Sequence, residues 1–288
     1  MSRIAYVNGQ YVPNDHASVH INDRGFQFAD GIYEVIAITN GKLIDRNDHM
    51  ARCYRSLAEL RIPKPMSDRA MNIVMDQVIR RNLVRNGIIY MQITRGVTYV
   101  RDHAYSEELK PSIVITARTL KPVNMKQVRD GVSVISIPDT RWKRCDIKSI
   151  SLLPNILGKQ LAKESGAYEA WMVDDQGFVT EGTSSNAWIV TADGELVTRP
   201  TDHAILKGIT RVSVMALAEK AGFKIIERPF TLEEAKSAKE AFLTSTTSLV
   251  KPVTEIDGTT VANGKPGALT EKLFELYETY TDEIGKGA

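Results

Sequence analysis

The chain has 288 residues, 25% of them charged, and its 37 lysines and arginines nearly balance 35 aspartates and glutamates. This length suits about two domains with a substantial core, and the even spread of charge lacks the basic arm typical of nucleic-acid-binding chains. We therefore expect a small-molecule partner and no nucleic-acid partner.

The cysteines and the hydropathy indicate a soluble protein of a reducing compartment. Cys53 and Cys145 are too few for a disulfide framework in a chain of this size. Apolar segments stay well short of transmembrane length, and the first residues read as a strand rather than as a signal peptide. His16 and His20 lie four residues apart without a third ligand, so we expect no metal. These features predict a cytoplasmic protein without a membrane partner.

The first predicted elements are two hairpins followed by two helices. Residues 4–12 and 31–45 alternate in strand fashion, and each run is broken by an Asn-Gly pair, the strongest short hairpin signal. Apolar residues then recur at helical spacing over 50–60 and 67–79. These helices are expected to cover the sheet that the hairpins begin.

The second half mixes strands and helices without regular alternation. Two strands, at 88–96 and 111–119, end the first half, and the polar, proline-bearing residues 120–131 look like a linker. Strand patterns then occupy 131–138, 167–175, 186–190, 223–229 and 240–246, and helical patterns occupy 156–166, 211–222 and 269–280. Because hairpins outnumber strand-helix-strand units, we expect an α+β fold with antiparallel or mixed sheets. The domains are predicted at 1–120 and 121–288.

The commonest cofactor and hydrolase motifs are missing from the sequence. It contains no G-x-G-x-x-G, no G-x-x-x-x-G-K-[ST], no G-x-S-x-G and no H-E-x-x-H. Dinucleotide-binding, P-loop, α/β-hydrolase and zinc-protease sites of the usual kinds are therefore excluded.

Lys148 lies in a stretch, "RWKRCDIKSISLLPN", that places cations before it and apolar residues around it. Lysine forms imines with carbonyl compounds when its amine is neutral, a state that desolvation and nearby cations favour. Such a stretch is also compatible with an ordinary surface lysine. The local sequence leaves both interpretations open.

Two hydroxyl clusters and a helix start add further candidate contacts. "TEGTSSN" begins at Thr180 and contains Glu181, and "TSTTS" begins at Thr244. Serine and threonine also serve turns and helix caps, so each cluster alone is ambiguous. In "LKGITR", free amides at Ile209 and Thr210 open an amphipathic helix and would favour an anion such as phosphate.

Taken in order, the strings "DRGFQFADGIYEV", "RCDIKS", "YEA", "VTEGTSSN", "LKGITR" and "TSTTS" resemble fold-type IV pyridoxal-phosphate aminotransferases, and most closely D-amino-acid transaminases. The resemblance covers nearly the whole chain. It implies a small N-terminal α/β domain and a larger C-terminal domain with a mixed, barrel-like sheet, which binds the cofactor at the domain interface and carries Lys148. It also implies a homodimer.

The resemblance gives the candidate residues their roles around pyridoxal 5'-phosphate. Lys148 would hold the cofactor as a Schiff base and shuttle a proton, and Glu181 would pair with the pyridine nitrogen. The phosphate would be bound by Arg52, Ile209, Thr210, Ser245 and Thr246.

On the substrate side, Arg101 and His103 match an Arg-x-His carboxylate trap that Tyr33 completes. Fixing the carboxylate on one side of the cofactor decides which substituent of the substrate Cα faces the lysine. Two departures bear on pocket size and pH response: residues 97–100, "VTYV", are bulkier than expected for the family, and Asp102 stands between the two donors.

The expected activity is transfer of the amino group of a D-alanine-like donor to a 2-oxo acid by a ping-pong mechanism. A branched-chain L-amino-acid transaminase, an (R)-amine transaminase and an aminodeoxychorismate lyase share the lysine and the acid and stay open as alternatives. A non-catalytic pyridoxal-phosphate carrier is the alternative outside the enzymes.

Overall fold

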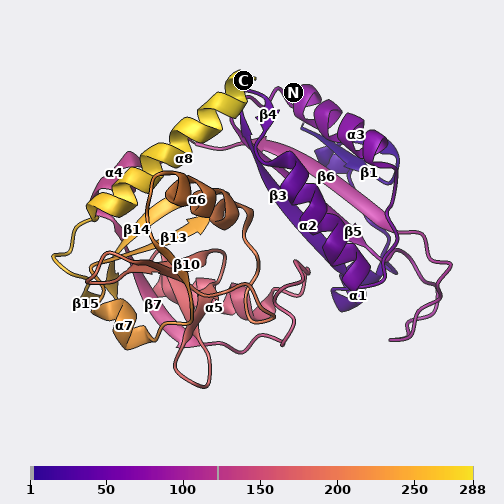
Figure 1. The fold of residues 1–288 in the computed structure, drawn as a ribbon. Helices are drawn as coiled ribbons and strands as arrows, with labels where there is room; N and C mark the ends of the chain where they lie inside the picture. Colours follow the sequence, from indigo (N-terminus) through magenta and orange to yellow (C-terminus); the bar gives the residue numbers. More distant parts are fainter. Residues whose placement is uncertain (1–2, 122, 288) are drawn as a thin grey trace. The chain divides into compact units, whose positions relative to one another are not determined.

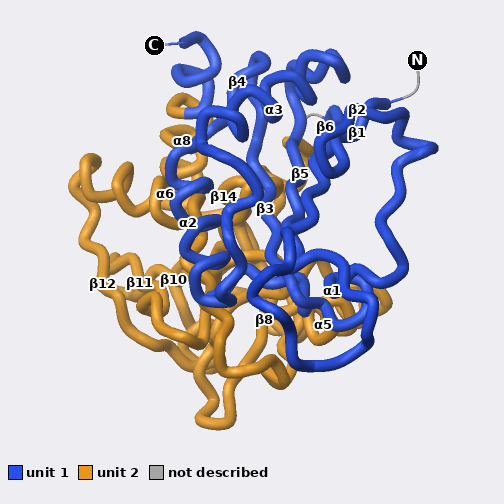
Figure 2. Tube along the Cα trace, turned by 90° about the vertical axis from the view of Figure 1, so that its right-hand side faces the viewer, with its two compact units in different colours: residues 1–121, 147–151, 281–288 blue, residues 122–146, 152–280 orange. Residues whose placement is uncertain are grey.

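The computed structural model describes residues 3–121 and 123–287. Two compact units divide the chain, and Figure 2 colours them blue and orange. The first comprises the described residues of 1–121, 147–151 and 281–288, and the second those of 122–146 and 152–280. The domain boundary expected near residue 120 stays a prediction. The structure differs in placing 147–151, and with it Lys148, in the first unit.

The first unit is built on an antiparallel six-stranded sheet in the order β2-β1-β6-β5-β3-β4. Its strands are β1 (Ile4–Val7), β2 (Gln10–Pro13), β3 (Gly31–Thr39), β4 (Lys42–Leu43), β5 (Gly87–Thr94) and β6 (Ser112–Thr119). Both predicted hairpins are present, because β1 pairs with β2 and β3 with β4. The turn residues Asn40 (φ 51°) and Gly41 (φ 82°) have the left-handed backbone that such tight turns require.

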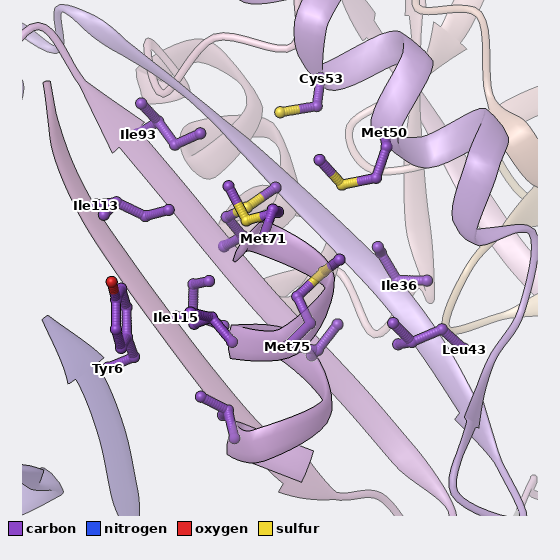
Figure 3. Packing of buried hydrophobic residues seen from close by; sticks show 14 of the residues in the cluster. Tyr6, Ile36, Leu43, Met50, Cys53, Met71, Met75, Ile93, Ile113 and Ile115 are labelled. Atoms are coloured by element: carbon purple, nitrogen blue, oxygen red, sulfur yellow. The ribbon is translucent and has the colours of Figure 1, made fainter. Parts of the chain in front are cut away.

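Two helices and the sheet enclose a sulfur-rich core in the first unit. The helices of this unit are η1 (Asn14–His16), α1 (Arg24–Phe28), α2 (Arg46–Glu59) and α3 (Asp68–Arg81). Figure 3 shows side chains of α2 and α3, among them Cys53 and Met75, facing Ile36 and Ile115 of the strands. The predicted helices are thus confirmed, and Ser67 caps α3 by accepting a hydrogen bond from the Ala70 amide.

The second unit contains a mixed nine-stranded sheet in the order β12-β11-β10-β13-β14-β7-β8-β9, with β15 paired to β14. Its strands are β7 (Val132–Pro138), β8 (Glu169–Val173), β9 (Val179–Gly182), β10 (Asn186–Val190), β11 (Leu196–Thr198), β12 (Ile225–Glu227), β13 (Glu240–Ser245), β14 (Leu249–Ile256) and β15 (Thr259–Thr260). The pairs β11/β12, β14/β7 and β7/β8 are parallel, and the others antiparallel. The expected mixed α+β fold is confirmed.

Helices precede, interrupt and follow these strands along the chain (Figure 1). They are α4 (Met125–Asp130), α5 (Leu153–Glu164), α6 (Ile209–Lys220), α7 (Leu232–Lys236) and α8 (Ala268–Lys286). The prediction of a linker over 120–131 was wrong in part, because α4 lies within it. The Asn124 side chain caps α4 by accepting from the Lys126 amide, and buried Val128 anchors the helix.

Strand β14 was not predicted, and it carries Pro252 in its middle, where proline normally argues against a central strand. The pairing of β14 explains how the proline is accommodated. Pro252 lies opposite Phe242 of β13, whereas β7 joins β14 only from Val253 onward. Within the described residues, no helix is long and apolar enough to cross a membrane.

Candidate active site

The segment 147–151 is attached to the start of β3 by backbone pairing. The Tyr33 amide donates to the Lys148 carbonyl over 3.0 Å, and the Ile150 amide donates to the Gly31 carbonyl over 3.0 Å. The Lys148 amide in turn donates to Ser56 Oγ on α2 over 3.3 Å. These bonds explain why Lys148 belongs to the first unit, although its neighbours in sequence belong to the second.

The amine of Lys148 lies over an aromatic ring. Its Nζ is 4.2 Å from the centroid of the Tyr33 ring, and the side chain is half-buried. Tyr33 is itself stacked on Tyr90, with ring centroids 6.0 Å apart. Two of the predicted site residues, Lys148 and Tyr33, are therefore neighbours, and the amine contacts the Tyr33 ring.

Arg52, the predicted phosphate ligand, is held by a buried carboxylate. Its Nε donates to Glu34 Oε1 over 2.8 Å and its Nη2 to Oε2 over 2.7 Å. His49 Nδ1 lies 2.8 Å from the same Oε2. Burial would raise the pKa of Glu34, but Arg52 and His49 outweigh it and lower the pKa to about 2.

His49 is kept neutral by the same surroundings. Burial lowers the pKa of its imidazole, and the cations Arg52 and Lys148 lower it further, against the opposing effect of Glu34. Neither Glu34 nor His49 was identified from the sequence. The sequence feature that could have identified Glu34 is its position on the face of β3 that otherwise carries Ile32 and Ile36.

Arg101 and His103 lie on the connection between β5 and β6, and both are exposed. The Arg101 guanidinium is 4.6 Å from the centroid of the Phe28 ring, and the His103 ring is 5.5 Å from it. The structure therefore brings the two donors together on Phe28.

In the second unit, Glu181 of β9 lies at the centre of a buried hydrogen-bond network. Arg141 Nη1 donates to its carboxylate. Asn186 Nδ2 donates to the same carboxylate over 3.1 Å. The Leu206 amide also donates to it, over 3.2 Å. Burial raises the pKa of Glu181, although Arg141 and the Leu206 amide favour the charged form.

The network connects Glu181 to the start of α6. Asn186 Nδ2 also donates to the Leu206 carbonyl over 3.0 Å, and Gly208 is the N-cap of the helix that Ile209 and Thr210 open. A side chain at Gly208 would meet Asn186 Oδ1 at 2.1 Å. The glycine therefore allows the close approach that joins the candidate acid to the candidate anion site.

The two hydroxyl clusters have different environments. Thr183, Ser184 and Ser185 all donate to buried Glu169, the latter two over 2.7 and 3.3 Å. Ser245 Oγ, at the end of β13, accepts from the Ser248 amide over 3.0 Å. The first cluster thus binds the carboxylate of Glu169, a residue that was not predicted from the sequence.

Comparison with known proteins places this arrangement in a family. The model of amino-transferase class IV matches residues 31–256, which include Lys148, Glu181 and the start of α6. The chain belongs to the class IV aminotransferases. Enzymes of this class depend on pyridoxal phosphate, so the family, enzyme class and cofactor expected from the sequence are confirmed.

Curated relatives of this class IV aminotransferase are similar over nearly their whole length. It is 43% identical over 268 residues to D-alanine aminotransferase of Bacillus licheniformis, covering 92% of this chain and 93% of the relative. It is 37% identical over 280 residues to D-alanine aminotransferase of Staphylococcus aureus MSSA476, and the match covers 96% of this chain and 97% of the relative.

Solved structures of branched-chain amino acid aminotransferases share the fold of this class IV aminotransferase. The T.th. enzyme complexed with N-(5'-phosphopyridoxyl)-L-glutamate has a TM-score of 0.87 at 25% identity, with 98% of this chain and 95% of that chain covered. The enzyme of Thermoproteus uzoniensis with norvaline has a TM-score of 0.85 at 26% identity, with 99% of this chain and 96% of that chain covered.

Proposed function

We propose that this class IV aminotransferase transfers the amino group of a D-amino acid resembling D-alanine to a 2-oxo acid in two half-reactions. The observation that carries the proposal is its identity of 37–43% to D-alanine aminotransferases over more than nine tenths of the chain. The Arg-x-His pair at Arg101 and His103, with Tyr33, supports the same substrate class.

The donor groups fit the three parts of pyridoxal phosphate. A guanidinium, helix-start amides and hydroxyls suit a phosphate, and we assign them to the residues Arg52, Ile209, Thr210, Ser245 and Thr246. The buried carboxylate of Glu181 suits a protonated pyridine nitrogen, and the amine of Lys148 suits the aldehyde. When bound, the cofactor withdraws electrons from the carbon that bears the amino group and stores that group between half-reactions.

In this proposal Lys148 both attaches the cofactor covalently and moves a proton. As a free amine, its Nζ would take a proton from the substrate Cα and later release it again. The Tyr33 ring, 4.2 Å from Nζ, restricts where that amine can lie. The carboxylate of Glu181, whose charged form Arg141 and the Leu206 amide favour, would hold a proton at the pyridine nitrogen.

The Lys148→Ala variant tests the assignment of the base. Turnover of D-alanine with a 2-oxo acid is expected to vanish, while the cofactor still binds through its phosphate contacts. An Arg101→Ala variant is the matched comparison, because it is expected to weaken binding of the carboxylate and to retain turnover at saturating substrate. Unchanged activity of Lys148→Ala would refute the assignment.

A branched-chain L-amino-acid transaminase is the second candidate. The observation that favours it is the likeness to the branched-chain enzyme of Thermoproteus uzoniensis, at a TM-score of 0.85. An (R)-amine transaminase and an aminodeoxychorismate lyase would use the same lysine and acid. Substrate tests distinguish them, and a carrier without activity would turn over none of these substrates.

We further propose a cytoplasmic homodimer with a domain boundary near residue 120. The dimer is supported by an exposed apolar stripe on α5, which consists of Leu153, Ile156, Leu157 and Leu161. These residues recur at helical spacing on one face, where an isolated chain would present them to water.

A further inference from the structure

The two proposed carboxylate donors lie on a long connection that has little structure of its own. It runs from Arg95 to Pro111, and its residues 101–108 are exposed. A connection of this length without helix or strand is typically functional or mobile. Donors on such a segment bind a carboxylate tightly only where another element fixes them, because otherwise ordering the loop opposes binding.

Arg24, the first residue of α1, contacts this connection through three successive carbonyl groups. Its Nη1 donates to the Asp102 carbonyl over 2.6 Å and to the Ala104 carbonyl over 3.4 Å. Its Nη2 donates to the His103 carbonyl over 2.9 Å. The guanidinium, with 4% of the side chain exposed, therefore fixes the backbone around His103.

Asp30, which directly precedes β3, orients the guanidinium. Arg24 Nε donates to Asp30 Oδ2 over 2.8 Å, and Arg95 donates to both carboxylate oxygens. Burial would raise the pKa of Asp30, but Arg95 and Arg24 outweigh it and lower the pKa. The carboxylate thus stays charged and ties the loop to the strand that carries Tyr33.

Phe28, at the other end of α1, contacts the two donor side chains themselves. The Arg101 guanidinium lies 4.6 Å from its ring centroid, a distance typical of a cation–π contact. The His103 ring meets it edge to face, with centroids 5.5 Å apart. One short helix therefore holds the backbone of the donor segment through Arg24 and its side chains through Phe28.

We propose that α1 positions the carboxylate-binding loop, with Arg24 and Phe28 as positioning residues that act through Arg101 and His103. The inference rests on the proposed function and deepens it. Because the donors are fixed before substrate arrives, less conformational entropy is lost on binding. Loss of either contact is therefore expected to affect the KM for D-alanine far more than kcat.

Arg24→Lys is the first test, because it keeps the charge near Asp30 and removes the planar fork. The KM for D-alanine is expected to rise about tenfold to a hundredfold, with kcat within about threefold of the parent enzyme. The visible absorption of the bound cofactor and the melting temperature check that the variant is folded and loaded. A folded variant with unchanged KM, or with a loss confined to kcat, would overturn the inference.

A double variant separates positioning from general stabilisation. If Arg24 acts through Arg101, combining Arg24→Lys with Arg101→Ala should raise KM by clearly less than the product of the two single effects. A KM increase in the double variant equal to the product of the two single increases would contradict action through Arg101.

Phe28→Leu is a second test if Arg24→Lys does not fold, although Phe28 also contacts the Arg24 guanidinium at 4.8 Å. Phe26→Leu is its matched control, since Phe26 lies on the same helix with 73% of its surface exposed. Only Phe28→Leu is expected to raise the KM for D-alanine, by about three- to tenfold. Equal KM values in both variants would overturn the role of α1. A parent enzyme that does not react with D-alanine would instead refute the proposed function.

Discussion

At the scale of single residues, the proposed phosphate ligand Arg52 depends on partners that are not themselves expected to touch the cofactor. One carboxylate, Glu34, holds both Arg52 and His49, with only 1% of its side chain exposed. Removing one partner of a buried ion pair leaves the other charged and unpaired, which is costly. The network therefore matters both for stability and for the direction in which Arg52 points.

Glu34→Gln is expected to destabilise the protein by about 3 kcal/mol at pH 7 because it leaves Arg52 without its charged partner. Glu219→Gln, at an exposed glutamate of α6, is the control and should change stability by less than about 0.5 kcal/mol. Urea unfolding at pH 7 measures both. Equal stabilities of the two variants would contradict the role assigned to Glu34.

The same network predicts an acid-dependent loss of stability. The pKa of Glu34 is about 2 in the folded state against 4.5 for the free group, so its stabilisation is complete above 4.5 and is lost as the pH falls toward 2. Burial also lowers the pKa of His49 from 6.5, so protonation below that pH favours unfolding. Urea midpoints should therefore fall as the pH drops below 6.5, and below pH 4.5 they should fall less steeply in Glu34→Gln than in the parent protein. Urea midpoints that depend on pH equally in the parent protein and in Glu34→Gln would contradict the role of Glu34.

Glu181 is predicted to act on the chemical step. Glu181→Gln keeps the shape of the side chain and removes the charge that is proposed to hold a proton at the pyridine nitrogen. We expect kcat to fall on the order of a hundredfold while KM changes little. Steady-state kinetics with D-alanine measure this, and a variant with the parent kcat would exclude Glu181 from the reaction.

At the scale of elements, Gly31 allows β3, β5 and the lysine segment to approach one another. A Cβ there would lie 2.6 Å from the Ile93 carbonyl oxygen and 3.2 Å from Ile150 Cδ1. Gly31→Ala is therefore expected to lower stability by about 1–3 kcal/mol and to lower kcat as well, because Lys148 moves. Val74→Ala, in the core on α3, is the control and should lower stability without lowering kcat. A Gly31→Ala enzyme with the parent kcat would show that the segment tolerates displacement.

Local signals in the sequence predicted most elements but not the partners of buried charges. Asn-Gly turns and the Ser67 cap are determined by nearby residues, so both hairpins and α3 were predicted. β14 was not predicted, and only its pairing with the neighbouring strands shows that a proline is tolerated at position 252. Glu34 and Arg141 were missed because their roles depend on contacts with residues distant in sequence.

At the scale of the whole molecule, the stripe on α5 predicts how copies of the chain associate. Ile156→Glu should dissociate the proposed dimer, since a charge within an apolar interface is strongly unfavourable. Ile73→Glu is the control, because Ile73 lies on α3 with a similar exposure, 52% against 59%. Sedimentation of both variants measures the mass. A dimeric Ile156→Glu protein would place the interface elsewhere.

The visible absorption of the cofactor-loaded protein during separate additions of D-alanine and L-leucine tests the central claim most directly. Transfer of the amino group to the bound cofactor changes the absorption band, so each half-reaction can be followed without an acceptor. The D-amino-acid assignment predicts loss of the band with D-alanine and an unchanged band with L-leucine. Loss with L-leucine alone would contradict it and assign the enzyme to the branched-chain transaminases.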